Sequence, residues 1–473
     1  MTRSRFTNSW LAVGGAFACC GLLATTAAIA QTDPSGAPTI PSAATVRITD
    51  GFTAFAESEA RFSSWRGTRG SNIFDPAPGK GSQFYSPFTV GFDQQVPDSY
   101  RAQVRAKSGY VHSSHRTPGQ EASIDTMVDT QVTVTVTNLA NESYRTFVGV
   151  ALNLPTGETF LPNNKRLTRM DPDLVDVGSY GAGINVNPTV GLVFALTENT
   201  GVSVSAGYSW QGSFTREALN PASIPPCPVA VVICPAVTPR FDLSTTIDPG
   251  DVFTANLNTS SIYENLAIKN SVAFMSETTL KQDGIPVGRK GLRLAANSAF
   301  TYRFDPRWTI VLNGSWSFAG KDKVARSYIT VPHDPVVPPV TPPVTTETIE
   351  PLLREPKNSN SHVVIGSVEP IYALTERMNV AANYSVLWRS KNSYDFIEDR
   401  FVPAKLKQSV GGSLTYLVTP MSSVSLRGSH FWVHIDAGQF QSFGSTSDPG
   451  PGFFPPSLHY TGWTAAMSGK IQF

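Results

Sequence analysis

Apolar and small polar residues alternate with a period of two along most of this chain. In the clearest stretch, Val202 to Phe214, apolar side chains alternate with serine, glycine and glutamine. The preceding stretch, Ala182 to Leu196, alternates in the same way and is joined to it by Glu198 to Gly201. Because successive side chains of a β-strand point to opposite faces, the pattern predicts a hairpin of two long strands.

The same alternation recurs elsewhere in the chain. It covers residues 100–110, 132–136, 292–304, 308–316, 378–388 and 410–418. Many of these stretches are longer than the five or six residues of a usual globular strand. After residue 30, no segment approaches the roughly 18 consecutive apolar residues that a transmembrane helix needs, which excludes an α-helical membrane protein.

Short and long connections alternate between the predicted strands. Short turns are expected near Asp98, Asn138 to Asn141, Asn199, Asn265, Asp305 to Arg307, Thr375 to Arg377 and Thr419 to Met421. Longer loops are expected near residues 65–83, 114–122, 156–178, 217–249, 282–287, 319–359, 392–402 and 436–457. This organisation predicts an all-β fold, a transmembrane antiparallel up-and-down β-barrel of about sixteen strands, with short periplasmic turns and long extracellular loops. Residues 46–95 are the least regular, and if they form a plug the count falls to about fourteen.

The N-terminus has the pattern of a secretory signal peptide. Arg3 and Arg5 precede the apolar segment Trp10 to Ala24, and Ala28-Ile29-Ala30 form a small-residue cleavage site. We therefore expect residues 1–30 to be removed on export, 31–45 to be a disordered periplasmic segment, and 46–473 to form the barrel. A lipoprotein signal at Cys19 is the alternative, but the preceding residues suit it poorly.

The C-terminus is an amphipathic strand that ends in an aromatic residue. Trp463, Ile471 and Phe473 share its apolar face. This ending resembles the terminal strand of bacterial outer-membrane barrels, which implies that the barrel assembly machinery reads these residues. We expect the protein to lie in the Gram-negative outer membrane, with membrane lipid as a partner.

Two cysteines remain after the signal peptide, Cys227 and Cys234, within a Pro-flanked loop. In an oxidising compartment a disulfide between them is the default expectation, because a metal site needs more ligands than this stretch offers. Residues 331–345 are rich in proline and favour an extended polyproline II spacer.

Charge is scarce and balanced. Only 15% of residues are charged, against about 25% in an average soluble protein, and 37 Lys+Arg face 36 Asp+Glu. The balance excludes an electrostatically driven nucleic-acid partner. In a barrel the low charge has a physical reason, because the outward face must be apolar where it meets lipid.

Strand parity predicts which charged residues line the pore. The predicted pore-lining residues are Arg101, Arg105, Lys107, Arg145, Arg293, Arg389, Lys405, Lys407 and Arg427, together with Asp129 and Glu277. Other acids, including Asp171, Asp173 and Asp176, fall in predicted loops, so we expect a cationic lumen beneath an acidic rim. Rings of Arg and Lys favour anions, which predicts passage of small polar or anionic solutes such as organic acids. The alternative is structural: the cations form salt bridges with acidic loops that fold inward.

One part of the sequence resembles a known family. Its segments are FVGVALNLPTGE from Phe147 to Glu158, MDPDLV from Met170 to Val175, GSYGAGINV from Gly178 to Val186 and AGYSWQGSF from Ala206 to Phe214. They resemble outer-membrane transporters of the phenol meta-pathway type, distantly similar to the long-chain fatty acid transporter. The resemblance implies uptake of aromatic or other hydrophobic small molecules. The predicted cationic lumen departs from this and suits carboxylated aromatics better, and no ligand site is carried over.

Two other classes of function stay open. Loops 217–249 and 319–359 suit an adhesin or receptor whose pore is incidental. An outer-membrane esterase or acyltransferase would need a nucleophile with histidine, and His112 beside Ser113 and Ser114 is the nearest arrangement. No catalytic motif is present, so we predict no enzyme activity, no catalytic residue, no metal and no cofactor, with a small-molecule solute as the ligand.

Overall fold

A computed structural model describes residues 52–67, 79–96, 99–117, 119–141, 143–217, 244–325, 352–395, 400–436 and 457–473. The expected signal peptide, the segment 31–45, the Pro-rich stretch 331–345 and both Cys227 and Cys234 lie outside these residues. Among the described residues, no helix is long and apolar enough to cross a membrane.

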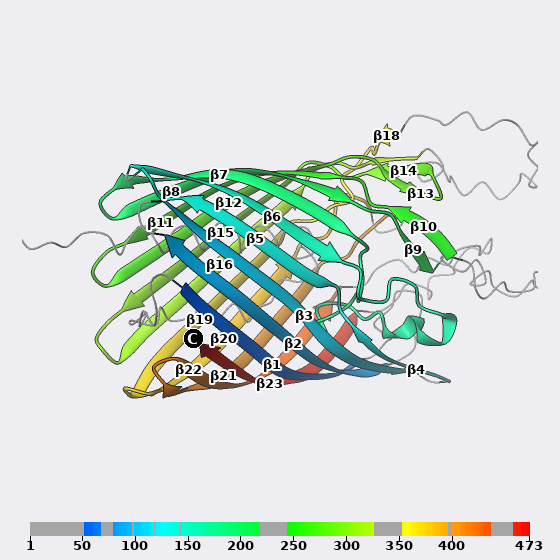
Figure 1. Ribbon diagram of the computed structural model, residues 1–473. Helices are drawn as coiled ribbons and strands as arrows, with labels where there is room; N and C mark the ends of the chain where they lie inside the picture. The colour runs from blue at the N-terminus through cyan, green and yellow to red at the C-terminus, as the bar shows by residue number, and fades with distance from the viewer. Residues whose placement is uncertain are drawn as a thin grey trace, which may run out of the picture.

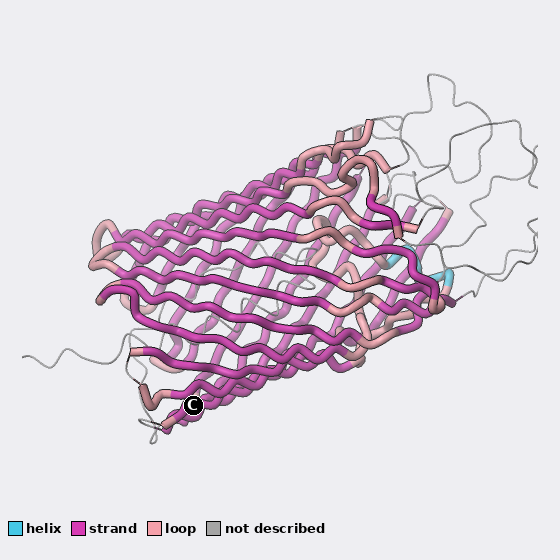
Figure 2. Tube along the Cα trace, turned by 90° about the horizontal axis from the view of Figure 1, so that it is seen from above, coloured by secondary structure: helices cyan, strands magenta, loops and turns pink. Residues whose placement is uncertain are grey.

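The described chain forms a closed antiparallel barrel (Figures 1 and 2). The first wall strands are β1 (Phe52–Gly67), β2 (Lys80–Val96), β3 (Tyr100–Thr117), β4 (Gln120–Met127), β5 (Thr130–Asn138), β6 (Tyr144–Leu154), β7 (Asn185–Thr197) and β8 (Thr200–Gln211). The others are β11 (Val252–Ile262), β12 (Leu266–Glu277), β15 (Arg293–Arg303), β16 (Trp308–Ala319), β19 (Val363–Thr375), β20 (Met378–Arg389), β21 (Lys405–Thr419), β22 (Ser422–Ile435) and β23 (Leu458–Gln472).

Sixteen strands cross the wall, as the sequence predicts. The main sheet has 17 strands, but β4 and β5 both pair with β3 and follow one another along it, so together they make one wall strand. β1 pairs with β2 on one side and with β23 on the other, which closes the barrel. The first hairpin is therefore part of the wall, and the fallback count of fourteen does not apply.

Successive connections alternate between the two ends of the barrel, although the longer loop expected near residues 114–122 is only the connection 118–119 between β3 and β4. At the end that carries the C-terminus, hereafter the turn end, strands are joined by residues 97–99, 139–143, 198–199, 263–265, 304–307, 376–377 and 420–421. At the opposite end, the loop end, the connections are residues 68–79, 118–119, 155–184, 212–251, 278–292, 320–362, 390–404 and 436–457.

Short strands of three of these connections form a small second sheet at the loop end (Figure 1). They are β9 (Phe214–Glu217), β10 (Ser244–Asp248), β13 (Leu280–Gln282), β14 (Ile285–Arg289), β17 (Lys323–Val324) and β18 (Leu353–Arg354). Phe214, expected to end a long strand, belongs to β9, because β8 ends at Gln211. A 3₁₀ helix, η1 (Asn163–Thr168), lies in the connection 155–184.

The outward face is a belt of exposed apolar side chains. Val148 and Val190 are 58% exposed, and Met467 is 55% exposed. Outward tryptophans stand near the loop end of their strands, at Trp210, Trp388, Trp432 and Trp463, and Trp308 begins β16 at the turn end. An apolar band bordered by aromatic side chains is the surface that lipid covers, so the alternation seen in the sequence is that of a transmembrane barrel.

Candidate functional site: the lumen and its inward loop

The inward faces of the strands carry the predicted pore-lining cations. On β3, Val104 and Tyr110 are exposed on the outer face, so Arg101, Arg105 and Lys107, at the opposite parity, face the lumen. By the same parity, the other predicted cations face inward: Arg145 on β6, Arg293 on β15, Arg389 on β20, Lys405 and Lys407 on β21, and Arg427 on β22.

Charge is concentrated on one side of the lumen. Most of these cations lie on the consecutive wall strands β20 to β23 and β1 to β3. On the other side, β8 and β11 present neutral polar side chains inward, namely Ser203, Ser205, Ser209, Asn256 and Asn258. The lumen therefore has a charged side and a neutral polar side.

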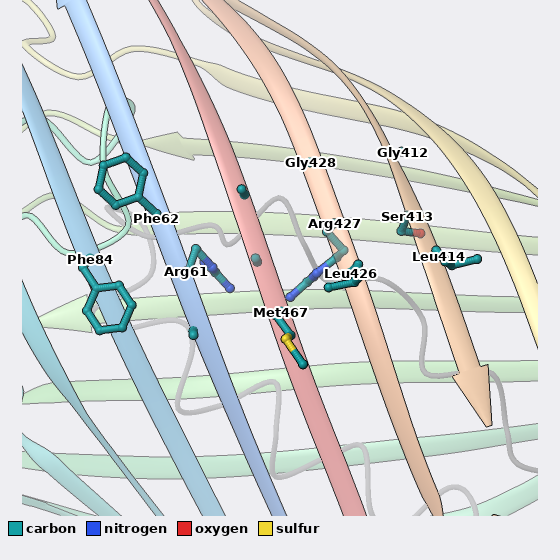
Figure 3. A pocket seen from close by; sticks show the side chains of 13 residues that line it. Arg61, Phe62, Phe84, Gly412, Ser413, Leu414, Leu426, Arg427, Gly428 and Met467 are labelled. Carbon is teal, nitrogen blue, oxygen red and sulfur yellow. The ribbon is translucent and has the colours of Figure 1, made fainter. Parts of the chain in front are cut away.

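Carboxylates that the alternation did not predict lie on or beside the charged side. Glu59 on β1 accepts hydrogen bonds from Arg61 on its own strand and from Arg427 on β22, both at 2.7 Å. Figure 3 shows Arg61 and Arg427 extending toward one another from the two strands that flank β23. Glu369 on β19 is also inward and buried. Glu59 escaped prediction because residues 46–95 show the weakest alternation.

The connection 155–184 folds into the barrel and packs against the inner wall. Its Met170, Leu174 and Val175 form a buried cluster with Trp65, Phe431, Val433 and Tyr460, which come from β1, β22 and β23. The Trp65 indole N–H donates to the Met170 sulfur at 3.3 Å. Gln83 on β2 holds both backbone groups of Val177 at 2.8 Å. This connection, hereafter the inward loop, crosses the lumen from β6 to strands that are distant around the wall.

Acidic residues of the inward loop neutralise wall cations. Lys405 donates to Asp171 at 2.9 Å and to Asp173 at 2.5 Å, and its own side chain is only 6% exposed. Lys407 donates to the carbonyl of Asp173 at 2.7 Å. Asp176 accepts from Arg61 at 2.7 Å. These aspartates were expected at an acidic rim. Instead they lie inside the barrel and bind wall cations. This is the alternative arrangement, in which acidic loops fold inward and form salt bridges with the cations.

The Asp171 carboxylate stays ionised in this setting. Burial by itself raises the pKa of Asp171, but the ammonium group of Lys405 and the backbone N–H of Asp173 outweigh it and hold the pKa below its ordinary value. Asp171, Asp173 and Lys405 therefore form a buried ion cluster, in which removal of Lys405 would leave the two carboxylates without their shared ammonium partner.

Asp129 fastens the base of the inward loop. It lies in the break between β4 and β5, and its carboxylate accepts from the backbone N–H groups of Gly157 at 2.9 Å and Ala182 at 2.8 Å. The Asn153 amide donates to the same carboxylate at 2.6 Å. A Cβ at Gly157 would lie 1.9 Å from the carbonyl oxygen of Tyr180, so the two ends of the loop approach too closely for another side chain. Asp129, predicted to line the pore, binds both ends of the inward loop.

A second anchor lies at the outer side of the loop. Glu217 on β9 binds the guanidinium of Arg169 and accepts from the backbone N–H of Leu161 at 3.1 Å. Burial opposes ionisation of Glu217, but the Arg169 hydrogen bond lowers the pKa below the ordinary value. The inward loop is thus held at its base, along the wall and at the rim.

Other inward cations make contacts away from the inward loop. Arg101 pairs with Asp93, and Arg293 pairs with Glu277 at 2.6 Å near the loop end. Arg105 lies 5.3 Å above the ring of Phe55, with Lys470 at 5.9 Å from the same ring.

Lys107 and Arg145 differ from the predicted pore-lining cations that carboxylates bind. Among the described residues, Lys107 and Arg145 form no ion pair, and the Arg145 Nε is buried without a hydrogen-bond partner. Arg389 donates to the carbonyl of Pro403 at 3.1 Å.

The remaining candidate residues do not build a catalytic or metal site. His112 contacts Asp125 at 2.8 Å on the outer face, whereas Ser113 faces inward against Gln83. Asp125 therefore lies on the outer face. Within the described residues, no group of three His, Cys, Asp or Glu side chains could hold a metal ion. The predicted assembly signal lies on the outer face: Trp463 and Ile471 on β23, and Phe473 directly after it, are exposed.

The loops above the barrel are tied together by two buried acids. Glu355 is fully buried and binds Arg400 at 2.8 Å and Ser359 at 3.0 Å. Asp322 accepts from Lys290 at 3.0 Å and from the backbone of Gly291 at 2.9 Å. These bonds join three neighbouring connections at the loop end.

No family model and no curated protein matches the sequence. The barrel is similar to the P. putida toluene transporter TodX, with 10% identity over 90% of this chain and 91% of TodX, at a TM-score of 0.37. It is also similar to a Pseudomonas aeruginosa FadL homologue, with 8% identity over 89% and 90% of the two chains and a TM-score of 0.37. A bacterial polysaccharide outer membrane secretin shares 7% identity over 88% of this chain and 98% of its own, with a TM-score of 0.37. At these identities the likeness concerns the fold.

Proposed function

We propose that the protein is an outer-membrane channel or transporter that passes small polar or anionic solutes, with carboxylated aromatics and other organic acids as the preferred class. The observation that carries the proposal is the pair of inward cations, Lys107 and Arg145, that lack a carboxylate partner among the described residues. Unpaired Arg and Lys side chains in a pore attract anions and repel cations.

The side chains on the charged side support carboxylated aromatics as preferred solutes. The Phe55 ring stands between Arg105 and Lys470, so an apolar face and two cations are presented together. A carboxylated aromatic can use both, through ring contact and through charge. The neutral polar side offers hydroxyl and amide groups for the rest of a hydrated solute.

The inward loop lowers the number of unpaired cations in the lumen. It removes Lys405 and Lys407 from the free cations of the lumen, because Asp171 and Asp173 bind them. Net selectivity then depends on the cations away from the loop, and a modest anion preference is expected rather than a strong one.

The test is the reversal potential of the purified protein in planar bilayers under a KCl gradient. We expect an anion-selective sign that weakens in Lys107→Gln and in Arg145→Gln. Lys80→Gln, which removes an exposed cation from the outer wall, is the matched control and leaves selectivity unchanged. A cation-selective wild-type channel would overturn the proposal, and absence of solute flux in liposomes from a folded barrel would favour a receptor instead.

A further inference from the structure

Three cations form a row on the outer wall at the loop end. Strand register places Arg66 of β1 opposite Lys80 of β2, and Lys80 opposite Arg116 of β3. All three have the outward parity of their strands and are exposed. The row is thus a cross-strand line of positive charge on the lipid-facing side of the barrel.

Such a row is unfavourable unless an anion lies on it. Like charges directly opposite one another on neighbouring strands repel. Arg116 pairs with Glu121 of β4, but no ion pair of Arg66 or Lys80 occurs among the described residues. One carboxylate therefore serves three cations, which leaves excess positive charge toward β1 and β2.

On the turn-end side of the row, hereafter below it, the outer face becomes less polar with distance from the cations. Four positions below it, Phe62 of β1 lies opposite Phe84 of β2. Two positions below it are hydroxyl groups, where Ser82 and Ser114 hydrogen bond at 2.9 Å. Apolar rings, hydroxyls and cations thus follow one another toward the loop end, in the order in which a phosphorylated lipid presents its chains, its backbone and its phosphates.

A hollow of about 540 Å³ continues the row on its β23 side. Its outward lining includes Arg66, Gln408, Trp432, His434, His459 and Thr461. Thr461 is the register partner of both Arg66 and Trp432. His434 and His459 approach to 3.2 Å between their Nδ1 atoms. The hollow offers hydrogen-bonding groups over an aromatic floor, directly beside the excess charge.

We propose that this surface binds the phosphorylated headgroup of a lipid A molecule of the outer leaflet. Its phosphates lie on Arg66 and Lys80, its sugar over the hollow at Trp432 and His459, and its acyl chains along Phe62 and Phe84. Guanidinium and ammonium groups are the usual partners of phosphate, and cations near a membrane surface attract anionic headgroups. The inference rests on the proposed outer-membrane location, with the loop end outward, and is independent of the solute.

The test compares lipid A binding by the detergent-solubilised barrel and by variants. Native mass spectrometry measures affinity for diphosphorylated lipid A and for the same lipid after removal of its phosphates. We expect Arg66→Gln and Lys80→Gln each to weaken binding of the phosphorylated lipid about fivefold, and the double variant about twentyfold. The dephosphorylated lipid is expected to bind weakly to all of them.

A matched double variant removes two exposed cations at the other end, Arg307→Gln with Arg377→Gln. It is expected to bind as the wild type does, and heat-modifiable gel mobility checks that all variants are folded. Equal affinity of the Arg66/Lys80 variant and the wild type, or equal loss in the matched control, would overturn the inference. Single-channel conductance of the Arg66/Lys80 variant is expected to stay at the wild-type value. Bilayer recordings therefore test the channel proposal, and lipid A binding tests this inference, independently of one another.

Discussion

Phe473 and Ala54 exchange two backbone hydrogen bonds, of 2.8 and 3.1 Å. The last residue of the chain is therefore the final pair of the seam between β23 and β1, and its ring stands exposed on the outer wall. The seam joins the first and last strands of the barrel.

Variants of Phe473 can distinguish an effect on barrel assembly in cells from an effect on the stability of the folded barrel. Phe473→Ala keeps both backbone bonds and removes only the ring, so we expect folding into detergent to be unchanged and the folded fraction in cell outer membranes to fall several-fold. Deletion of Phe473 also removes the two bonds, at about 1 kcal/mol each. Heat-modifiable mobility measures both. An equal yield of Phe473→Ala and wild type in cells would contradict an assembly role for the ring.

Asp129 controls the inward loop from its base. In Asp129→Asn, an amide replaces one of the two carboxylate oxygens that accept the Gly157 and Ala182 N–H groups, so the base is loosened. We expect a larger or noisier single-channel conductance and faster proteolysis between residues 155 and 184, with a cost of about 1–3 kcal/mol in loop anchoring. Asp93→Asn, at the turn-end ion pair with Arg101, serves as control, and an identical conductance change there would argue against the anchor.

Acidification is expected to release the inward loop from the wall over a defined pH range. Since the pKa of Asp171 is held below its ordinary value in the folded protein, the ion pair with Lys405 contributes stability above about pH 4 and loses it as pH falls below that value. We expect constant conductance from neutral pH to about pH 5 and an increase below about pH 4. Asp171→Asn is expected to remove the acid step. A transition near pH 6 would instead point to a histidine and contradict this assignment.

The two faces of one strand can be tested at neighbouring residues. Leu257 is exposed on the outer face near the middle of β11, and Asn258 follows it on the inner face. Leu257→Arg places a cation in lipid and is expected to destabilise the barrel by about 2–4 kcal/mol, whereas Asn258→Arg costs far less. Urea unfolding in lipid vesicles measures both. Equal costs would mean that the wall is not oriented as described.

The local sequence pattern was sufficient to predict the strands of the barrel wall and the two faces of each strand. Because side chains alternate with a period of two in any strand, the segment 202–214 already showed which of its residues face lipid and which face inward, and the same reasoning placed Lys107 and Lys405. Strand number followed from the same alternation. The boundaries were less certain, since Ile184 and Phe214 alternate correctly but lie outside β7 and β8.

The contents of the lumen depended on tertiary structure. Asp171 and Lys405 are 234 residues apart, and nothing near either residue in the chain indicates that an acidic loop folds inward to meet a buried lysine. The row Arg66, Lys80 and Arg116 likewise exists only because the registers of three strands align. The sequence by itself determined the faces of the wall, because strand geometry is local. Barrel closure and loop packing decided which charges meet, because those contacts join distant segments.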